Sequence, residues 1–300
     1  MRFLLAPDLS APTGGNRYDA ELLARAVARH LVVGSSAGSL ERSLAQVPDG
    51  ATVLLDGLVA SARPDVLAAH AGRVRLVLLV HLLRADDVPV EPVLEQEVRS
   101  LRLVDAVVVP SRSAARRVQE VSGVQAVVAE PGTAPARPST ARGAHRLLSV
   151  GTVGPRKGQR IAAEAVARLG GPWTLRCAGT VAEGFALPGT SLLGPLDPAA
   201  LQAEWDRADL HVLLSQAEPY GMAVAEGLAR AVPSLVADRG ELPDLLGGAG
   251  IVVEPDVDAV CAALVRWAAS ADLRRSARRA AADRELPTWE ETARIVRETS

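Results

Sequence analysis

The sequence predicts an α/β protein made of two Rossmann-like domains, and three features of the chain lead to this prediction. Short runs rich in Val and Leu alternate with helical patterns, as expected for parallel sheets covered by helices on both faces. A length of 300 residues exceeds one typical domain core. The Pro- and Ala-rich segment from Pro131 to Gly143 has no periodicity and is typical of a linker.

The expected elements follow from the two periodicities. Strands are expected over Arg2–Ala6, Leu31–Val33, Thr52–Leu55, Val74–Val80, Ala106–Val109, Val124–Ala129, Arg146–Val150, Thr174–Ala178, Ser191–Leu193, Leu210–Leu214, Ser234–Val236 and Gly250–Val253. Helices are expected over Tyr18–His30, Val93–Arg102, Ser111–Val121, Gln159–Leu169, Pro198–Ala208, Gly221–Ala229, Asp256–Ala269, Ala271–Arg284 and Thr288–Glu298.

These elements divide into an N-terminal domain over residues 1–138, a C-terminal domain over 139–286 and a last segment over 287–300. Ligands of open α/β sheets bind beyond the carboxyl ends of the strands. A site is therefore expected in a cleft faced by both sheets.

Composition excludes several classes of protein. With 48% hydrophobic and 23% charged residues the chain is globular, and a net charge of −2 offers no electrostatic footprint for nucleic acid. Cys177 and Cys261 stand far apart without metal-ligand spacing, which favours a reducing compartment. The start of the chain has too short an apolar run for a signal peptide, and the longest apolar run, Leu76 to Leu83, is too short to span a membrane. A cytoplasmic protein is expected.

Lysine occurs once, at Lys157, beside Arg156 in the segment Gly151-Thr-Val-Gly-Pro-Arg-Lys-Gly158. This segment follows an expected strand and precedes an expected helix, so backbone N–H groups of its turn and the helix N-terminus can face an anion. Arginine offers a planar fork for phosphate oxygens and lysine a mobile point charge. Phosphate binding is one interpretation. An ordinary strand-to-helix turn that happens to contain the single lysine is the other.

A second segment, Ser215-Gln-Ala-Glu-Pro-Tyr-Gly-Met-Ala-Val-Ala-Glu226, follows the strand at Leu210–Leu214. Glu218 lies on the loop and Glu226 one to two turns into the helix, so the two carboxylates can reach different parts of one ligand. The N–H groups of Gly221, Met222 and Ala223 open the helix as an anion site. Alternatively, Glu218 is a partner of the helix dipole and Glu226 a solvated helix residue.

Together these segments resemble the retaining glycosyltransferases of family 4 (glycosyl transferases group 1), which have the GT-B fold. Seven residues separate Glu218 from Glu226, as in the paired-glutamate motif of that family. Further segments agree in order and spacing: Gly14-Gly-Asn-Arg-Tyr18, Gly151 to Gly158, Val232 to Ala237, Gly240 to Asp244 and Pro287 to Glu291.

The resemblance implies that the C-terminal half holds a nucleotide-diphospho sugar. Arg156 and Lys157 would grip the diphosphate, Glu226 the ribose hydroxyls and Glu218 the sugar hydroxyls. The remaining diphosphate contacts it implies are the amides of Gly221, Met222 and Ala223, and Gly15 in the first glycine loop. His81 matches a family histidine beside the donor sugar and, with Glu218, is implied as catalytic; the alternative is a histidine that caps a strand.

The family also implies transfer with retention, no metal and no cofactor besides the substrate nucleotide sugar. It further implies that the helix of the last segment, residues 287–300, packs back on the N-terminal domain. Asp256-Val-Asp258 spells a metal motif of another glycosyltransferase fold, but acids at that place are favoured as helix caps. Thr152 and Leu82 depart from the commoner family pattern.

Two other functions stay open: a nucleotide-sugar 2-epimerase of the same fold and a non-catalytic nucleotide-sugar binding module. The acceptor is a small molecule, lipid or glycan that the sequence does not identify, and nothing in it supports a peripheral membrane contact.

Overall fold

The computed structural model describes residues 1–36, 38–87 and 91–300. The chain divides into two compact units. Unit 1 comprises Met1–Gly132 and Pro287–Ser300, and unit 2 comprises Thr133–Leu286. The chain therefore passes from one unit to the other twice, after Gly132 and after Leu286.

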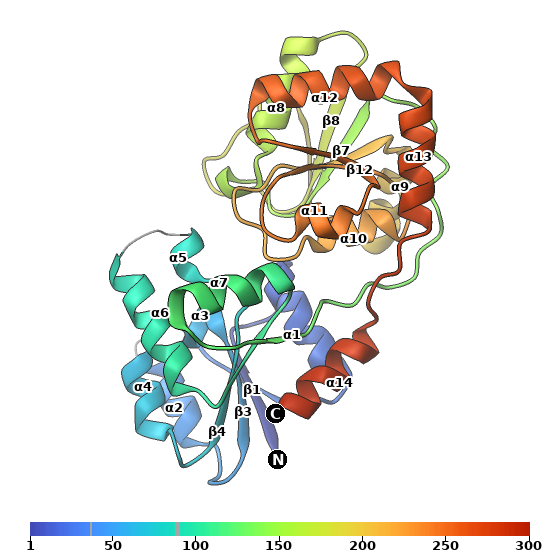
Figure 1. The fold of residues 1–300 in the computed structure, drawn as a ribbon. Helices are drawn as coiled ribbons and strands as arrows, with labels where there is room; N and C mark the ends of the chain where they lie inside the picture. Colours follow the sequence, from blue (N-terminus) through green and yellow to red (C-terminus); the bar gives the residue numbers. More distant parts are fainter. Residues whose placement is uncertain (37, 88–90) are drawn as a thin grey trace. The chain divides into compact units, whose positions relative to one another are not determined.

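Unit 1 is a six-stranded parallel sheet covered by helices (Figure 1). The strands, in spatial order, are β2 (Arg29–Val32), β1 (Arg2–Ala6), β3 (Thr52–Asp56), β4 (Arg75–Leu79), β5 (Ala106–Val109) and β6 (Val127–Val128). The helices are α1 (Gly14–Ala24), α2 (Ser39–Ala45), α3 (Gly57–Ala60), α4 (Pro64–His70), α5 (Arg84–Asp87), α6 (Glu91–Leu103), α7 (Arg112–Ser122) and α14 (Trp289–Thr299). The central strands bury apolar side chains on both faces, which is why they read as continuous Val and Leu runs in the sequence.

Unit 2 repeats this plan with a second six-stranded parallel sheet (Figure 1). Its strands, in spatial order, are β12 (Gly250–Val253), β11 (Ser234–Ala237), β10 (Leu210–Leu213), β7 (Arg146–Val150), β8 (Thr174–Ala178) and β9 (Ser191–Gly194). Its helices are η1 (Pro155–Lys157, a 3₁₀ turn), α8 (Gln159–Leu169), α9 (Pro198–Arg207), α10 (Met222–Leu228), α11 (Leu242–Leu246), α12 (Val257–Ala269) and α13 (Ala271–Ala282). Helices α8 and α12 lie side by side over a core that includes the fully buried Trp267.

The strand order reverses once in each sheet. In unit 1 the chain starts in β1, and β2 lies on one side of β1 while β3 lies on the other. In unit 2 it starts in β7, continues outward through β8 and β9, and then returns to β10 on the opposite side. Connections leave in opposite directions at such a point and open a crevice at the carboxyl ends of the two strands. Each unit therefore has one position in its sheet where a ligand site is expected.

The helix expected over Tyr18–His30 is wrong at both ends. Helix α1 begins at Gly14, because the side chain of Thr13 accepts a hydrogen bond from the Asn16 amide and caps it. The helix stops at Ala24, and Ala26 takes a left-handed backbone conformation with φ of +53°. The chain then enters strand β2 at Arg29, so the end of the expected helix is an edge strand.

The last helix, α14, packs on α1 within unit 1. The ring of Trp289 is buried and meets the edge of the Tyr18 ring with centroids 5.7 Å apart. Gly132 permits this packing, since an added Cβ there would lie 2.1 Å from the backbone nitrogen of Trp289. The hydroxyl of Thr292 donates to the carbonyl of Glu130 at 2.6 Å, which joins the helix to the end of the N-terminal stretch.

A buried carboxylate anchors the first strand of unit 2. Asp209, just before β10, accepts hydrogen bonds from the amides of Gly143, His145 and Arg146 and from the Arg146 guanidinium at 2.9–3.2 Å. Burial alone would raise the pKa of Asp209, but these donors outweigh it and lower the pKa. The carboxylate thus fixes the segment that leads into β7.

We expect Asp209→Asn to lower the free energy of unfolding by about 2 to 3 kcal/mol, since an amide presents two donors to a site that contains only donors. Urea denaturation measures this. Asp272, whose side chain is 89% exposed, is the control, and its Asn variant should change stability by less than about 0.5 kcal/mol. Equal stability of the two variants would contradict the anchoring role.

His211 in β10 is a packing residue. Its side chain is fully buried, its Nδ1 lies 3.1 Å from the hydroxyl of Ser234, and its ring lies beside Trp205. Burial, with a smaller contribution from the charge of Lys157, lowers the pKa of His211 to about 3. The folded chain therefore keeps this ring neutral.

Stability should depend on pH through His211. Below about pH 6.5 His211 binds a proton in the unfolded chain but not in the folded chain, so the contribution of this residue to the free energy of unfolding falls by about 1.4 kcal/mol for each pH unit. We expect His211→Gln to remove this contribution from the slope in urea denaturations between pH 7 and pH 5. A wild-type slope in His211→Gln would show that the residue titrates normally.

Among the described residues, no helix combines the length and the apolar character needed to cross a lipid bilayer.

Candidate functional site

Three loops of unit 2 meet at the carboxyl ends of β7, β10 and β11, at the reversal of strand order. The loop after β7 leads through η1 into α8, and the loop after β10 leads into α10. They are joined directly, because the amide of Gln216 donates to the carbonyl of Arg156 at 2.9 Å. The Arg156 guanidinium also donates to the carbonyl of Ala217 at 3.1 Å. The two segments singled out in the sequence therefore form one site.

A largely buried ion pair lies at the centre of this site. Nζ of Lys157 lies 2.6 Å from Oε2 of Glu218, and the hydroxyl of Ser215 donates to the same oxygen at 3.1 Å. Burial alone would raise the pKa of Glu218, but Lys157 outweighs it, Arg156 and Ser215 add to the effect, and the pKa is lowered. Glu218 is therefore a carboxylate at neutral pH. Arg156 and Lys157 thus place two cations beside this carboxylate.

Two glycines let these loops approach one another. Gly158 has φ of +70°, and an added Cβ would lie 2.1 Å from the carbonyl oxygen of Leu214 at the end of β10. Gly240, in the loop after β11, has φ of +58°, and its Cβ would lie 2.1 Å from the carbonyl oxygen of Glu218. Any side chain at either position would separate the loops.

Two helices begin at this site with glycine at the N-cap. Gly158 precedes α8 and Gly221 precedes α10, and neither supplies a side-chain acceptor for the first amides. In α10 the amides of Val224 and Ala225 donate to the carbonyl of Gly221, so Met222 and Ala223 precede the first helical hydrogen bond. By contrast α1, α7, α9, α12, α13 and α14 are capped by Thr, Ser or Asp side chains.

Glu226 lies one turn into α10 and is half-buried. Arg230 donates to its backbone carbonyl at 2.8 Å.

Asp256, at the start of the other acidic pair in the sequence, caps α12 by accepting from the amide of Ala259 at 2.8 Å, and Asp258 forms an ion pair with Arg168. Asp256 therefore has the capping role favoured from the sequence.

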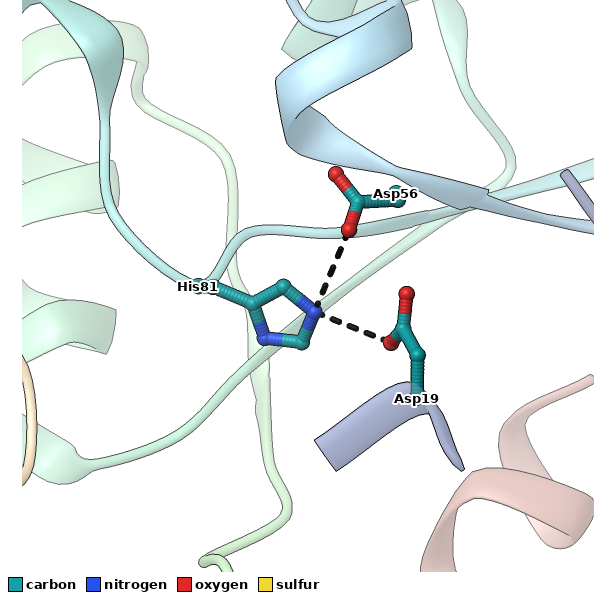
Figure 2. A group of neighbouring side chains, drawn as sticks. All are labelled: Asp19, Asp56 and His81. Carbon is teal, nitrogen blue, oxygen red and sulfur yellow. Dashed lines mark hydrogen bonds and ion pairs between the residues drawn. The ribbon is translucent and has the colours of Figure 1, made fainter. Parts of the chain in front are cut away.

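In unit 1, His81 follows β4 and lies between two buried carboxylates (Figure 2). Its Nε2 is 3.0 Å from Oδ1 of Asp19 and 3.7 Å from Oδ2 of Asp56. Asp19 comes from α1, and Asp56 is the last residue of β3 and the N-cap of α3, accepting from the amide of Leu58 at 2.5 Å. These elements surround the reversal of strand order in the sheet of unit 1.

The three groups shift one another's protonation. Burial disfavours the charged form of His81, but Asp19 and then Asp56 outweigh it and raise its pKa to about 9. Burial raises the pKa of Asp56 to about 7; His81 acts against this rise and Asp19 adds to it. The ligand atoms of the three side chains lie within 4.8 Å of one another, a spacing that would also admit a divalent cation.

Gly15 was expected in a glycine loop, but it lies in the first turn of α1 and has an ordinary helical position. Its lack of a side chain makes room for His81, because an added Cβ would lie 3.0 Å from Cδ2 of that ring. The contact of Gly15 with a diphosphate stays a prediction.

Sequence reasoning missed Asp19 and Asp56. Asp56 directly follows the buried run Val53–Leu55, where a parallel strand ends and a site residue is expected. Asp19 lies four residues after Gly15, which places both on one face of α1. This signal was hidden because the helix was expected to begin only at Tyr18.

Solved structures with the same architecture extend over both units. Sucrose-phosphate synthase from Thermosynechococcus elongatus matches with a TM-score of 0.77 and 18% identity, over 98% of this chain and 96% of that chain. Anabaena Alr3699/HepE in complex with UDP and glucose matches with a TM-score of 0.77 and 17% identity, over 100% of this chain and 99% of that chain. A structure described as trehalose-6-phosphate from E. coli bound with UDP-2-fluoro glucose matches with a TM-score of 0.66 and 11% identity, over 100% and 96%.

The fold is GT-B. The predicted class, two Rossmann-like domains each with a parallel sheet, is confirmed. Residues 144–270 match the model of the family described as "Glycosyl transferases group 1", and this range contains all three loops of the unit 2 site. No curated protein matches the chain.

Removing one partner of the Lys157–Glu218 pair should lower the free energy of unfolding more than removing both partners does. We expect Lys157→Met to lower the free energy of unfolding by about 3 to 5 kcal/mol, because it leaves a buried carboxylate without its cation. Lys157→Met combined with Glu218→Gln should recover a large part of this loss in urea denaturation.

The exposed pair Arg168–Asp258 is the control for this cycle, and its coupling energy should be about 0 to 1 kcal/mol. Additive effects of the Lys157 and Glu218 substitutions would mean that the two side chains do not stabilise each other.

Proposed function

We propose that this protein is a glycosyltransferase that moves a sugar from a nucleotide-diphospho sugar to an acceptor, with retention of anomeric configuration and without a metal. The GT-B fold, the family match over residues 144–270 and the UDP or UDP-sugar present in two similar structures support this function. The observation that carries it is the basic turn Arg156–Lys157, bonded to the Glu218 loop at the strand reversal of unit 2.

The diphosphate is met by positive charge from three sources. Arg156 and Lys157 supply two cations, and the glycine-capped starts of α8 and α10 supply amides, among them those of Gly221, Met222 and Ala223. An arriving diphosphate meets both cations together with these amides, and they offset its negative charge. Its oxygens compete with Glu218 for Lys157, a flexible side chain that can serve both.

Glu218 and Glu226 hold the uncharged parts of the donor. Among the described contacts, Lys157 and Ser215 occupy Oε2 of Glu218, so its Oε1 accepts a hydrogen bond from a sugar hydroxyl. Glu226, further along α10, accepts hydrogen bonds from the ribose hydroxyls. The low pKa of Glu218 suits this role, since a carboxylate accepts and does not protonate the sugar.

In the reaction the bond between the anomeric carbon and the phosphate oxygen breaks, and both electrons leave with the nucleoside diphosphate. Arg156, Lys157 and the helix amides stabilise the negative charge that develops on this leaving group. The acceptor hydroxyl bonds to the anomeric carbon on the same face, and its proton passes to the departing phosphate oxygen. This sequence retains the configuration and requires no protein nucleophile.

We expect UDP or GDP to raise the melting temperature of the full-length protein, because a ligand of the folded state stabilises it. The shift should persist in EDTA. Arg156→Gln should reduce affinity by about tenfold or more, the value of one charge-assisted contact, in calorimetry.

Arg168→Gln removes an exposed arginine of the same unit and should bind as the wild type does. Equal affinity of the two variants would remove the diphosphate assignment. Release of nucleoside diphosphate that requires an acceptor supports transfer. Release or isomerisation without an acceptor would favour an epimerase, and binding without turnover a binding module.

A further inference from the structure

The cluster Asp19–Asp56–His81 of unit 1 determines which chemistry its histidine can perform. A neutral imidazole held by one carboxylate, with its other nitrogen free, is the arrangement of a general base. A protonated imidazole in the same place is a cation and donates a hydrogen bond from each nitrogen. The two forms predict opposite roles for His81, and the surroundings of the ring decide between them.

The ring orientation is fixed. Nε2 points at both carboxylates, and Nδ1 points away from them (Figure 2). Gly15 lies against Cδ2, and the Tyr18 ring meets the imidazole edge-on with centroids 5.0 Å apart. The side chain of His81 retains 19% exposure although Asp19 and Asp56 are buried, so the ring is the accessible member of the cluster.

Among the described residues, two acidic groups act on the charge of the ring: Asp19 from α1 and Asp56 from the end of β3. The neighbouring Tyr18 donates its hydroxyl to the carbonyl of Ala129 at 3.0 Å and, being buried beside Asp19, has a raised pKa. It is therefore neutral. Two acids around one imidazole stabilise its charged form more than a single acid does.

Bound protons are enough to balance the negative charge of this cluster, and a metal ion is not needed for that. Oδ2 of Asp19 is buried and has no hydrogen-bond partner among the described side chains. Burial is the main cause of the raised pKa of Asp56, and the neighbouring Asp19 adds to it, so a proton on Asp56 is available to the Asp19 carboxylate. One proton on Asp56 and one on His81 then balance two carboxylates, so the buried cluster has no net charge near neutral pH.

We infer that Asp19 and Asp56 are positioning residues that hold His81 as an imidazolium, so that its Nδ1–H is a charged hydrogen-bond donor to a substrate oxygen and not a proton acceptor. The identity of the substrate rests on the proposed function, whereas the protonation state does not. In a glycosyl transfer this cation orients an oxygen of the substrate. The acceptor proton must then leave by another route, which agrees with its transfer to the departing phosphate.

The protonation state is measured by NMR on the full-length protein with ¹³Cε1-labelled histidine. The chain has five histidines, and the spectrum of His81→Gln identifies the His81 signal. We expect this signal to titrate with a midpoint near 9 in the wild type. A midpoint at or below 6.5 would overturn the inference.

Asp56→Asn should lower the His81 midpoint by about one pH unit or more, because it removes one of two acids. Asp65→Asn, an exposed acid of the same unit that pairs with Arg99, should leave it unchanged. An unchanged midpoint in Asp56→Asn would show that the second carboxylate does not act on His81.

A metal would give a different result. Protein stripped with EDTA is mixed with Zn²⁺ or Mn²⁺ alone, and its melting temperature is compared with that of Asp19→Asn. No metal-dependent shift in either protein supports the inference. A rise in the wild type that is lost in Asp19→Asn would replace the shared protons by a metal centre.

The pH dependence of sugar transfer tests the role in substrate binding. We expect the rate to show no His81-dependent loss between pH 8 and pH 6 and to fall as His81 loses its proton near pH 9. A loss on the acid side near pH 6.5 that disappears in His81→Gln would make His81 a base. Absence of transfer under all conditions would refute the proposed function, while the NMR titration would still decide the protonation state.

Discussion

The site of unit 2 depends on the ion pair between Lys157 and Glu218. It links the loop after β7 to the loop after β10, and Gly240 brings the loop after β11 against the backbone of Glu218. A cation and a hydroxyl stabilise the largely buried carboxylate there. The same contact holds Lys157 at the place in the sheet where the strand order reverses. The side chains that join the loops are therefore the ones proposed to bind the diphosphate and the sugar.

The two units differ in the basic groups that lie beside their carboxylates at the strand reversal. In unit 2 the neighbouring cations Arg156 and Lys157 act on Glu218, an arrangement that suits an anionic ligand. In unit 1 one imidazole faces two acids, and the surplus is negative until a proton is bound. The cations of unit 2 favour the binding of an anion, whereas the acids of unit 1 favour the protonated form of His81.

Much of the fold could be predicted because buried parallel strands have a direct sequence signal. The strands Arg2–Ala6, Ala106–Val109, Arg146–Val150, Thr174–Ala178 and Gly250–Val253 have the expected bounds. The short helices α2, α4 and α11 were missed, since seven residues or fewer show little periodicity. Lys157 and Glu218 could be selected from their motifs, but their contact joins residues 61 positions apart and has no local signal. Asp19 was missed because a threonine cap started its helix one turn earlier than expected.

The path of the chain through the two units has a consequence for biosynthesis. Unit 2 is one continuous stretch, whereas unit 1 is completed by α14 from the far end of the chain. The Trp289 ring that packs beside Tyr18 leaves the ribosome only after all of unit 2. During translation the sequence of unit 2 is therefore complete before that of unit 1, although synthesis of unit 1 begins earlier. The surface of α1 stays uncovered until α14 emerges from the ribosome.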